Sequence, residues 1–239
     1  MHSNNYITVY TLVMTLIVSI GLAFVVTALR PMHATNEAVF KKKDILFSIQ
    51  DQLDGDLKTM KSQEILDLFG SRMEQVVLDA NGKEGSGVKA EDIDLAAEEK
   101  KPESERKYPL FIYSDGKGGK LYLLSVRGNG LWDKIWGYVA LKDDMNTIVG
   151  ASFGHASETP GLGAEIKDNP AFGAQFHNKT IFEGSEYVSV AVVKGGAKNP
   201  QHEVDAISGA TITSTGVSKM MFEGIKAYLP YFESAKAAN

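Results

Sequence analysis

The segment Tyr108–Leu141 reads YPLFIYSDGKGGKLYLLSVRGNGLWDKIWGYVAL, and it combines apolar runs with glycine-rich breaks. The runs are rich in Val, Ile, Tyr, Phe and Leu, a composition that favours β-strands. Glycine, asparagine and aspartate between the runs favour tight turns. The sequence therefore predicts strands over 109–114, 120–127 and 135–141, and similar runs predict further strands over 147–153 and 187–193.

A helix is predicted after these strands, from about Thr213 to Leu229, with Val217, Met221 and Tyr228 along one face. Strands followed by a closing helix, without regular βαβ alternation, indicate an α+β domain. We therefore expect a mostly antiparallel sheet with flanking helices.

Two more helices are predicted before the strands. The first runs from about Thr35, a suitable N-cap, to Gln50, and the second starts at Ser62 and carries apolar residues on one face as far as Val77. Residues 80–107 hold glycines and charges but almost no aromatic residues. This composition predicts a loop or a partly ordered connector.

The apolar run Ile7–Leu29 contains no charged residue, histidine, asparagine, glutamine or proline. At about 1.5 Å per residue it can cross the roughly 30 Å of a bilayer core as a helix. It is longer than the apolar part of a cleaved signal peptide and leads into Arg30-Pro31 rather than a small-residue cleavage site. We expect a tail (1–6), a retained single transmembrane helix (7–29), a helical neck and connector (30–107) and a folded domain (108–232).

The overall composition excludes several classes of function. The net charge of −5, from 25 Lys+Arg and 30 Asp+Glu, argues against a nucleic-acid binder. The chain has no cysteine, which excludes disulfides, Cys-ligated zinc, iron–sulfur clusters and thiol nucleophiles. The five histidines show no paired spacing, so no metal site is predicted. A redox function would therefore require an organic cofactor.

The hydroxyl-rich run Asp205–Gly216, DAISGATITSTG, lies where a strand-and-loop region enters the closing helix. Ser and Thr at such a place provide ordinary N-caps, which require only one or two of them. They also suit an anion cradle, because Gly209 permits a positive φ, Ala210 is small and the N–H groups of a helix start attract phosphate. Residue chemistry alone leaves both interpretations open.

Three other segments have local patterns of interest. The segment Glu158–Gly163, ETPGLG, could approach a flat ligand through its glycines, although spacing alone favours an ordinary surface loop. Lys194-Gly-Gly196 ends a strand in a turn beside a cation. Gly150-Ala-Ser-Phe-Gly154 matches the pattern of serine hydrolases, but it lacks the strand, sharp turn and helix of a nucleophile elbow.

The run Asp205-x-x-Ser208-Gly209-Ala210-Thr211 resembles the D-x-x-(S/T)-G-A-(T/S) signature that a dedicated flavin transferase reads when it links FMN, through its phosphate, to the last hydroxyl. Average residue frequencies would produce this match by chance in roughly one chain per thousand. The signature is therefore a specific one.

Further motifs occur in the order and spacing of the covalent-FMN subunit of the sodium-translocating NADH:quinone oxidoreductase, which this sequence resembles. They are GLW at 130–132 with GY at 137–138, ETPGLG at 158–163, NPA at 169–171 and VKGG at 193–196. The likeness runs from about Asn36 to Phe232 and includes one N-terminal membrane helix. It is weakest at 80–107, and Phe172 stands where the family suggests Trp.

This resemblance implies a covalent FMN cofactor in the domain 108–232, with Thr211 as the residue that carries the phosphate ester. Residues implied to shape the turn or bond the phosphate are Ser208, Gly209, Ala210 and Thr213. Residues implied to pack on or beside the isoalloxazine ring are Glu158, Thr159, Leu162 and Gly163, with Lys194 biasing its charge. The subunit would relay electrons between other subunits while the complex reduces quinone and pumps sodium, and the isolated chain would not be a catalyst.

Two lines of argument disagree about the side of the membrane on which the domain lies. Arg30 and the lysines at 41–43 follow the apolar run, and the positive-inside rule then predicts a cytoplasmic domain. The resemblance implies the periplasmic side of a bacterial inner membrane, where the flavin transferase acts. We expect the periplasmic side, because the motif match is more specific than a bias of four charges.

Two alternatives remain from the sequence. The flavin subunit of an Rnf-type electron-transport complex shares the tether signature and the ETPGLG run, although GLW at 130–132 followed by GYVAL at 137–141 favours the quinone reductase. A membrane-anchored module could also use the same loop to bind a phosphate ligand or a partner noncovalently.

Overall fold

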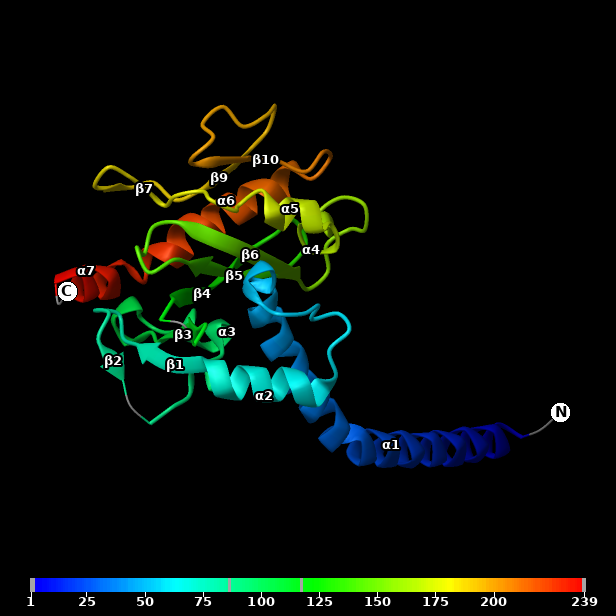
Figure 1. Cartoon of the computed structure of the whole chain (residues 1–239). Helices are drawn as coiled ribbons and strands as arrows, with labels where there is room; N and C mark the ends of the chain where they lie inside the picture. The colour runs from blue at the N-terminus through cyan, green and yellow to red at the C-terminus, as the bar shows by residue number, and fades with distance from the viewer. Residues whose placement is uncertain (1–2, 86, 117, 238–239) are drawn as a thin grey trace. The chain divides into compact units, whose positions relative to one another are not determined.

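A computed structural model of the chain describes residues 3–85, 87–116 and 118–237 (Figure 1). The chain divides into two compact units, Met1–Lys41 and Lys42–Asn239. Each unit has its own composition, since the first is mostly apolar helix and the second contains the whole sheet. Among the described residues, the main hydrophobic core lies in the second unit.

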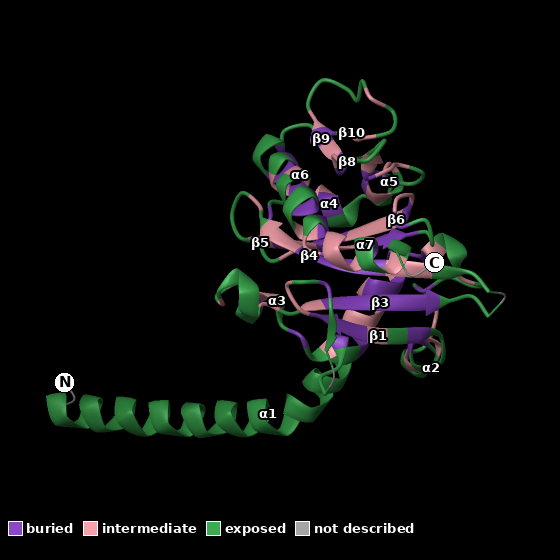
Figure 2. Ribbon diagram, turned by 90° about the vertical axis from the view of Figure 1, so that its left-hand side faces the viewer, coloured by how far each residue is buried: buried purple, intermediate pink, exposed green. Residues whose placement is uncertain are grey.

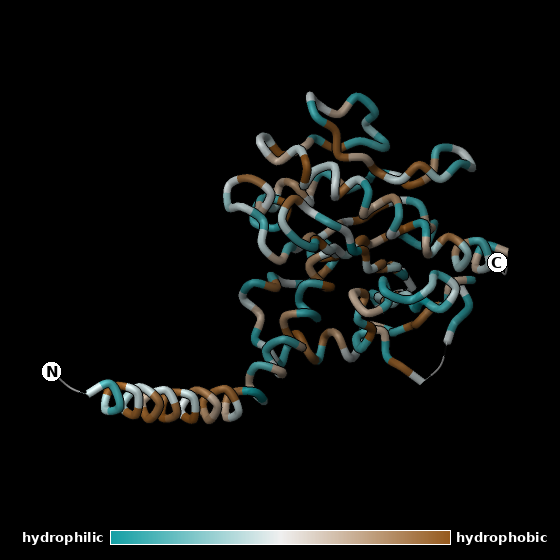
Figure 3. Tube along the Cα trace, turned by 180° about the vertical axis from the view of Figure 1, so that it is seen from behind, coloured by the Kyte–Doolittle hydropathy of each residue, from teal (hydrophilic) through white to brown (hydrophobic). Residues whose placement is uncertain are grey.

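The helix α1 (Asn4–Phe47) begins in the first unit and continues, without a break, into the second. Figure 3 shows hydrophobic residues along its N-terminal part, and no residue of its apolar window is buried. It is long and apolar enough to cross a membrane. The predicted separate helix with an N-cap at Thr35 is wrong, because Thr35 lies inside α1, where its hydroxyl donates to the Pro31 carbonyl (3.1 Å). Pro31 removes one backbone donor but does not end the helix.

Six antiparallel strands form the main sheet of the second unit, in the order β2-β1-β3-β4-β5-β6. They are β1 (Met73–Leu78), β2 (Glu84–Gly85), β3 (Tyr108–Ser114), β4 (Lys120–Asn129), β5 (Lys134–Leu141) and β6 (Ile148–His155). The predicted antiparallel sheet is confirmed. The β4–β5 hairpin runs in register from Tyr122↔Leu141 to Asn129↔Lys134, and its turn, 130–133, is part of the candidate cofactor site.

The second predicted helix is only partly right. The helix α2 (Ser62–Arg72) starts where expected, but the chain then enters β1, in which Val76 pairs with Leu110 of β3. The apolar spacing up to Val77 suits both structures, and pairing with β3 decides between them. The connector 80–107 contains β2 and the short helices η2 (Ala90–Asp92), α3 (Leu95–Glu98) and η3 (Glu103–Glu105).

Alternate residues of a strand point to opposite faces of the sheet, and helices cover both faces here. On one face, Leu124 and Val126 of β4 pack in the core with α6 (Thr211–Lys226), which lies across β4 and β5 (Figure 1). On the other face, the Phe111 ring of β3 meets Phe69 of α2 edge to face at 5.9 Å. Figure 2 shows β3 largely buried, as expected for a strand inside the sheet.

The remaining elements complete the domain. They are η1 (Gln50–Gln52), α4 (Glu165–Asp168), α5 (Pro170–Ala174), β7 (Phe182–Glu183), β8 (Glu186–Tyr187), β9 (Ala191–Val193), β10 (Glu203–Asp205) and α7 (Leu229–Ala237). The predicted strand 187–193 is divided, because Ser189 adopts a positive φ of 61° between β8 and β9. The predicted closing helix is confirmed in position but starts at Thr211.

Candidate cofactor site

Three loops meet at the start of α6. They are the β4–β5 turn (130–133), the loop after β6 (158–163) and the segment that leads from β10 into α6 (206–210). Side-chain hydrogen bonds and close contacts join all three. Segments that are distant in sequence therefore form one site, and most of the predicted cofactor residues belong to them.

Glu158 lies at the centre of the site, and its side chain points inward. It is 5% exposed; Oε1 accepts a hydrogen bond from the Trp132 N–H (3.0 Å), and Oε2 accepts one from Thr213 Oγ1 (2.6 Å). Burial alone would raise the pKa of Glu158, but the hydrogen bonds from Thr213 and from the 131–133 backbone outweigh it and hold the pKa below its usual value. The carboxylate is therefore ionised near neutral pH.

Two glycines allow the loops to approach one another. A Cβ at Gly163 would collide with the Glu158 carboxylate and lie 2.7 Å from Thr213 Oγ1. Gly209 has a φ of +77°, and a Cβ there would lie 2.6 Å from Leu162 Cδ2. Position 209 therefore favours glycine because of its backbone conformation, and glycine at 163 leaves the space that the Glu158 and Thr213 side chains occupy.

The start of α6 does not use its hydroxyls as N-caps. The N-cap residue is Ala210, which makes no side-chain capping bond. Among the described residues, the hydroxyls of Ser208 and Thr211 have no hydrogen-bond partner, and both residues are exposed. The first N–H groups of a helix also lack intrahelical acceptors, and they carry the positive end of its dipole. Of the two interpretations left by the sequence, this geometry favours the anion cradle.

An apolar surface surrounds this helix start. Trp132 is 68% exposed and Ile212 is 58% exposed, and Leu131 and Leu162 are also exposed. The Trp132 ring is oriented by its Nε1–H, which donates to Thr159 Oγ1 (3.0 Å). Leu131, Trp132 and Ile212 were not predicted as site residues; the signal for them was large apolar side chains beside glycine and hydroxyl residues.

Lys194 lies beside the same region through its backbone. The strands β9 and β10 are parallel, with Val193 opposite Asp205, and the Ala206 N–H donates to the Val193 carbonyl (2.9 Å). The Lys194 side chain is exposed and makes no hydrogen bond or ion pair with the described residues. The structure thus places Lys194 near the signature segment without a direct contact to Thr211.

The serine hydrolase pattern has a structural explanation. Ser152 lies in β6, and its hydroxyl donates to the Asp44 carbonyl (3.0 Å), while His155 Nδ1 accepts a hydrogen bond from the Glu158 N–H (3.1 Å). Neither contact joins the serine to the histidine. Within the described ranges no group of three or more His, Asp or Glu side chains could hold a metal ion.

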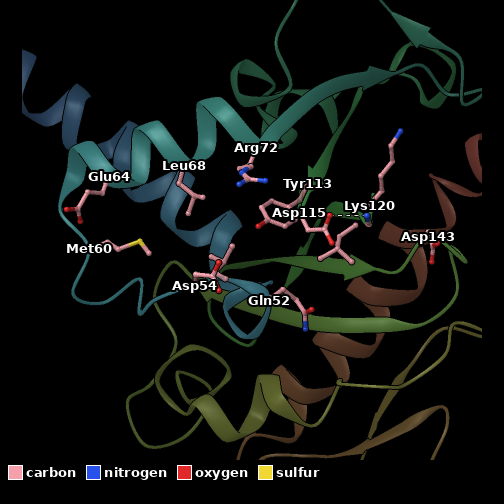
Figure 4. Close-up of a pocket in the computed structure, with 13 residues that line it drawn as sticks. Gln52, Asp54, Met60, Glu64, Leu68, Arg72, Tyr113, Asp115, Lys120 and Asp143 are labelled. Carbon is pink, nitrogen blue, oxygen red and sulfur yellow. Dashed lines mark hydrogen bonds between the residues drawn. The ribbon is translucent and has the colours of Figure 1, made fainter. Parts of the chain in front are cut away.

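A cavity lies at a different place in the domain (Figure 4). It has a volume of about 640 Å³ and is lined by residues of η1, α2 and the β3–β4 hairpin, among them Arg72, Tyr113 and Lys120. Lys120 begins β4, whereas Trp132 follows its end, so the length of the strand, about 30 Å, separates the two regions. The cavity is therefore distinct from the site at α6.

A helix start with an exposed hydroxyl, next to exposed apolar side chains, suits a flavin nucleotide, whose phosphate and ring need these two environments. The chain agrees with this class, since residues 130–226 match the family model of the FMN-binding domain. This match includes all three loops of the site.

Known relatives and solved structures identify the family more narrowly than the domain match does. The chain is 33% identical to the C subunit of the Na(+)-translocating NADH-quinone reductase of Neisseria meningitidis serogroup A, over 97% of this chain and 94% of the relative, and 32% identical to that of Pseudomonas aeruginosa, over 95% of each. The crystal structure of the C subunit from Parabacteroides distasonis superposes with a TM-score of 0.73 at 37% identity, over 85% of this chain and 96% of that one. The crystal structure of Shewanella oneidensis NqrC superposes with a TM-score of 0.69 at 28% identity, over 82% of this chain and 99% of that one. The chain therefore belongs to the NqrC family, the C subunits of the Na(+)-translocating NADH-quinone reductase.

Proposed function

We propose that this chain is an electron-carrier subunit of a sodium-pumping NADH:quinone oxidoreductase, with FMN ester-linked to Thr211. The observation that carries the proposal is the exposed, unpartnered hydroxyl of Thr211 at the N-terminus of α6, inside the transferase signature. When bound, FMN supplies one- and two-electron redox chemistry, and the protein supplies position and electrostatics.

The link requires an activated donor in which the FMN phosphate is joined to a second nucleotide, as in FAD. The Thr211 oxygen forms a new bond to the FMN phosphorus and releases its proton to solvent. The pyrophosphate bond breaks, and the second nucleotide leaves as its monophosphate. No electron is transferred in this step, and a flavin transferase is the partner that it requires.

The other residues of the site hold and surround the attached group. Ser208, Gly209 and Ala210 shape the turn before Thr211, and the first N–H groups of α6 would hold the phosphate. The ring would lie on the apolar surface next to residues Thr159, Leu162, Gly163, Leu131, Trp132 and Ile212, with Lys194 as the nearby cation. The hydroxyl of Thr213 is already bonded to Glu158, so we assign this pair to the protein scaffold.

In the proposed arrangement, residues 7–29 cross the bacterial inner membrane once. Residues 30–107 link this span to the cofactor domain and add β1 and β2 to its sheet, and 108–232 hold FMN on the periplasmic side. Other subunits of the complex donate and accept the electrons, and the isolated chain has no catalytic activity of its own. We further propose that sodium coupling is the work of partner subunits, since the span Ile7–Leu29 has no carboxylate.

Mass spectrometry of the full chain, co-expressed with a flavin transferase, tests the attachment. The wild-type chain should carry one FMN-sized adduct, and Thr211→Ala should abolish it, because no other exposed hydroxyl occupies the last position of the signature. Thr215→Ala, two helical positions beyond Thr213, is the matched control and should keep the adduct. An unmodified wild-type chain under these conditions would contradict the covalent link.

A further inference from the structure

Glu158 is a buried carboxylate that has no cation beside it. Within the described residues it forms no ion pair with Lys, Arg or His. Buried carboxylates are ordinarily paired, because an isolated charge is costly to remove from water. At Glu158 the compensation comes from hydrogen bonds alone, and these bonds come from two different segments.

The two oxygens of this carboxylate serve different elements. Oε1 accepts from the Trp132 N–H of the β4–β5 turn, and Oε2 accepts from Thr213 Oγ1 of the first turn of α6. The surrounding backbone leaves little room for another arrangement, since a Cβ at Gly130 would collide with Oε1 and one at Gly163 with Oε2. The carboxylate therefore joins the β4–β5 turn to the start of α6 in one fixed geometry.

Thr213 is the group through which this link reaches α6. It is 1% exposed, and it lies two residues after Thr211 in the same helical turn. A turn of helix is rigid on this scale, so fixing the Thr213 side chain also fixes the backbone of Thr211. Charge-assisted hydrogen bonds such as these are shorter and stronger than neutral ones.

We propose that Glu158 is a positioning residue, which acts through Thr213 to hold the first turn of α6, and with it Thr211, against the Leu131–Trp132 turn. The inference rests on the proposed function in one respect, namely that Thr211 is the attachment point. Glu158 thereby sets the orientation of the attached group relative to the apolar surface without touching it.

The test uses the full chain with three matched threonine variants. Thr213→Val removes the buried hydroxyl and keeps the shape, Thr213→Ser restores a hydroxyl, and Thr215→Val makes the same change at an exposed position of the same helix. Glu158→Gln removes the charge at nearly constant volume. Two properties are measured: amide hydrogen exchange at Trp132 in the chain expressed without the transferase, and the visible circular dichroism of the flavin after attachment.

Glu158→Gln should accelerate exchange of the Trp132 N–H by about tenfold, the change expected when a hydrogen bond to a charged group is weakened. Thr213→Val should also accelerate it, because it removes the Oε2 bond that holds the carboxylate against this N–H. The flavin dichroism should lose most of its amplitude in both variants, although the adduct mass remains. Thr213→Ser should restore both signals, and Thr215→Val should leave them unchanged. A purely general loss of stability would not be rescued in this selective way.

The contrary outcome is equally specific. Wild-type exchange and wild-type dichroism in both Thr213→Val and Glu158→Gln would overturn the positioning role, while a retained adduct at Thr211 would leave the proposed function intact. Absence of the adduct from the wild-type chain would instead contradict the proposed function, and the exchange measurement would still decide the role of Glu158. If Thr213→Val does not fold, Glu158→Gln decides the same question.

Discussion

Thr211 and Thr213 show how two similar residues in one helical turn acquire opposite roles. Each residue of an α-helix advances by about 100°, so positions two apart point to nearly opposite sides. Thr211 is exposed and Thr213 is 1% exposed, with its hydroxyl on Glu158. The signature predicts the attachment residue, but it could not predict the partner of Thr213, because Glu158 lies 55 positions away in sequence. That contact depends on the tertiary structure.

The hydrogen bonds of the buried Glu158 carboxylate should also contribute to the stability of the fold. Glu158→Ala would leave the Thr213 hydroxyl and the Trp132 N–H without an acceptor, and it should lower the free energy of unfolding at pH 7 by about 1–3 kcal/mol. Since folding lowers the pKa of Glu158, its stabilisation is present above the unfolded pKa of 4.5 and disappears as the pH falls through the folded pKa. Urea unfolding at pH 7 and at pH 3.5 measures both effects.

The control is Glu223→Ala, which alters an exposed carboxylate on the same helix α6. Its free energy of unfolding should stay within about 0.5 kcal/mol of the wild type. Equal losses in the two variants at pH 7, or a Glu158→Ala loss that is as large at pH 3.5 as at pH 7, would contradict the ionised, hydrogen-bonded state of Glu158.

At the scale of elements, the sequence predicted the strands that pair with their immediate neighbours in the chain. The strands of the β3–β4 and β4–β5 hairpins were predicted because their turns carry glycine, and neighbouring segments pair with each other. The strand β1 was missed because the partner along its whole length, β3, begins 30 positions after β1 ends, and the apolar spacing of β1 suits a helix as well as a strand. The long helix α1 was divided in prediction at Pro31, a residue that a long helix can accommodate.

Asp44 lies near the end of α1, and the burial of its carboxylate destabilises the folded state at neutral pH. Burial raises the pKa of Asp44 to about 6, and the nearby Lys167 and Lys43 offset this only partly. The folded state therefore binds the proton more tightly than the unfolded chain, whose pKa is 3.8, and stability falls as the pH rises from about 4 to 6. Asp44→Asn should raise the free energy of unfolding at pH 7 by about 1–2 kcal/mol and flatten this pH dependence.

Thermal unfolding of the full chain in detergent between pH 4 and pH 7 measures the effect. Asp51→Asn changes an exposed acid a short distance along the chain and should leave the profile as in the wild type. An Asp44→Asn variant whose stability followed the wild-type pH profile throughout would show that the carboxyl is well solvated in the folded protein.

At the scale of the whole molecule, the apolar helix and the folded domain suit different environments. Under the proposed function, the helix crosses a bilayer and the cofactor domain lies in the compartment in which a flavin transferase acts. A periplasmic domain is expected despite the basic residues after Leu29, because large domains can translocate regardless of flanking charge.

A reporter fused after Asn239 tests the side of the membrane. Alkaline phosphatase, which requires export, should be active, and a green fluorescent protein that folds only in the cytoplasm should remain dark. The control is the same pair of fusions to a chain that lacks residues 1–30, in which the pattern should reverse. A fluorescent, phosphatase-inactive fusion of the full chain would place the domain in the cytoplasm and remove the transferase from its reach.

The bond between Glu158 and Thr213 has a consequence for maturation. It joins the loop after β6 to a helix that forms near the C-terminus, so its geometry exists only after the sheet and α6 have come together. Under the proposed function, a chain in which α6 has not yet packed on the sheet would present Thr211 outside its loop setting and would be a poor acceptor, whereas a folded variant that lacks only this bond would still be modified. Cofactor attachment would then act as quality control, since it would mark those copies that have completed folding before they join the complex.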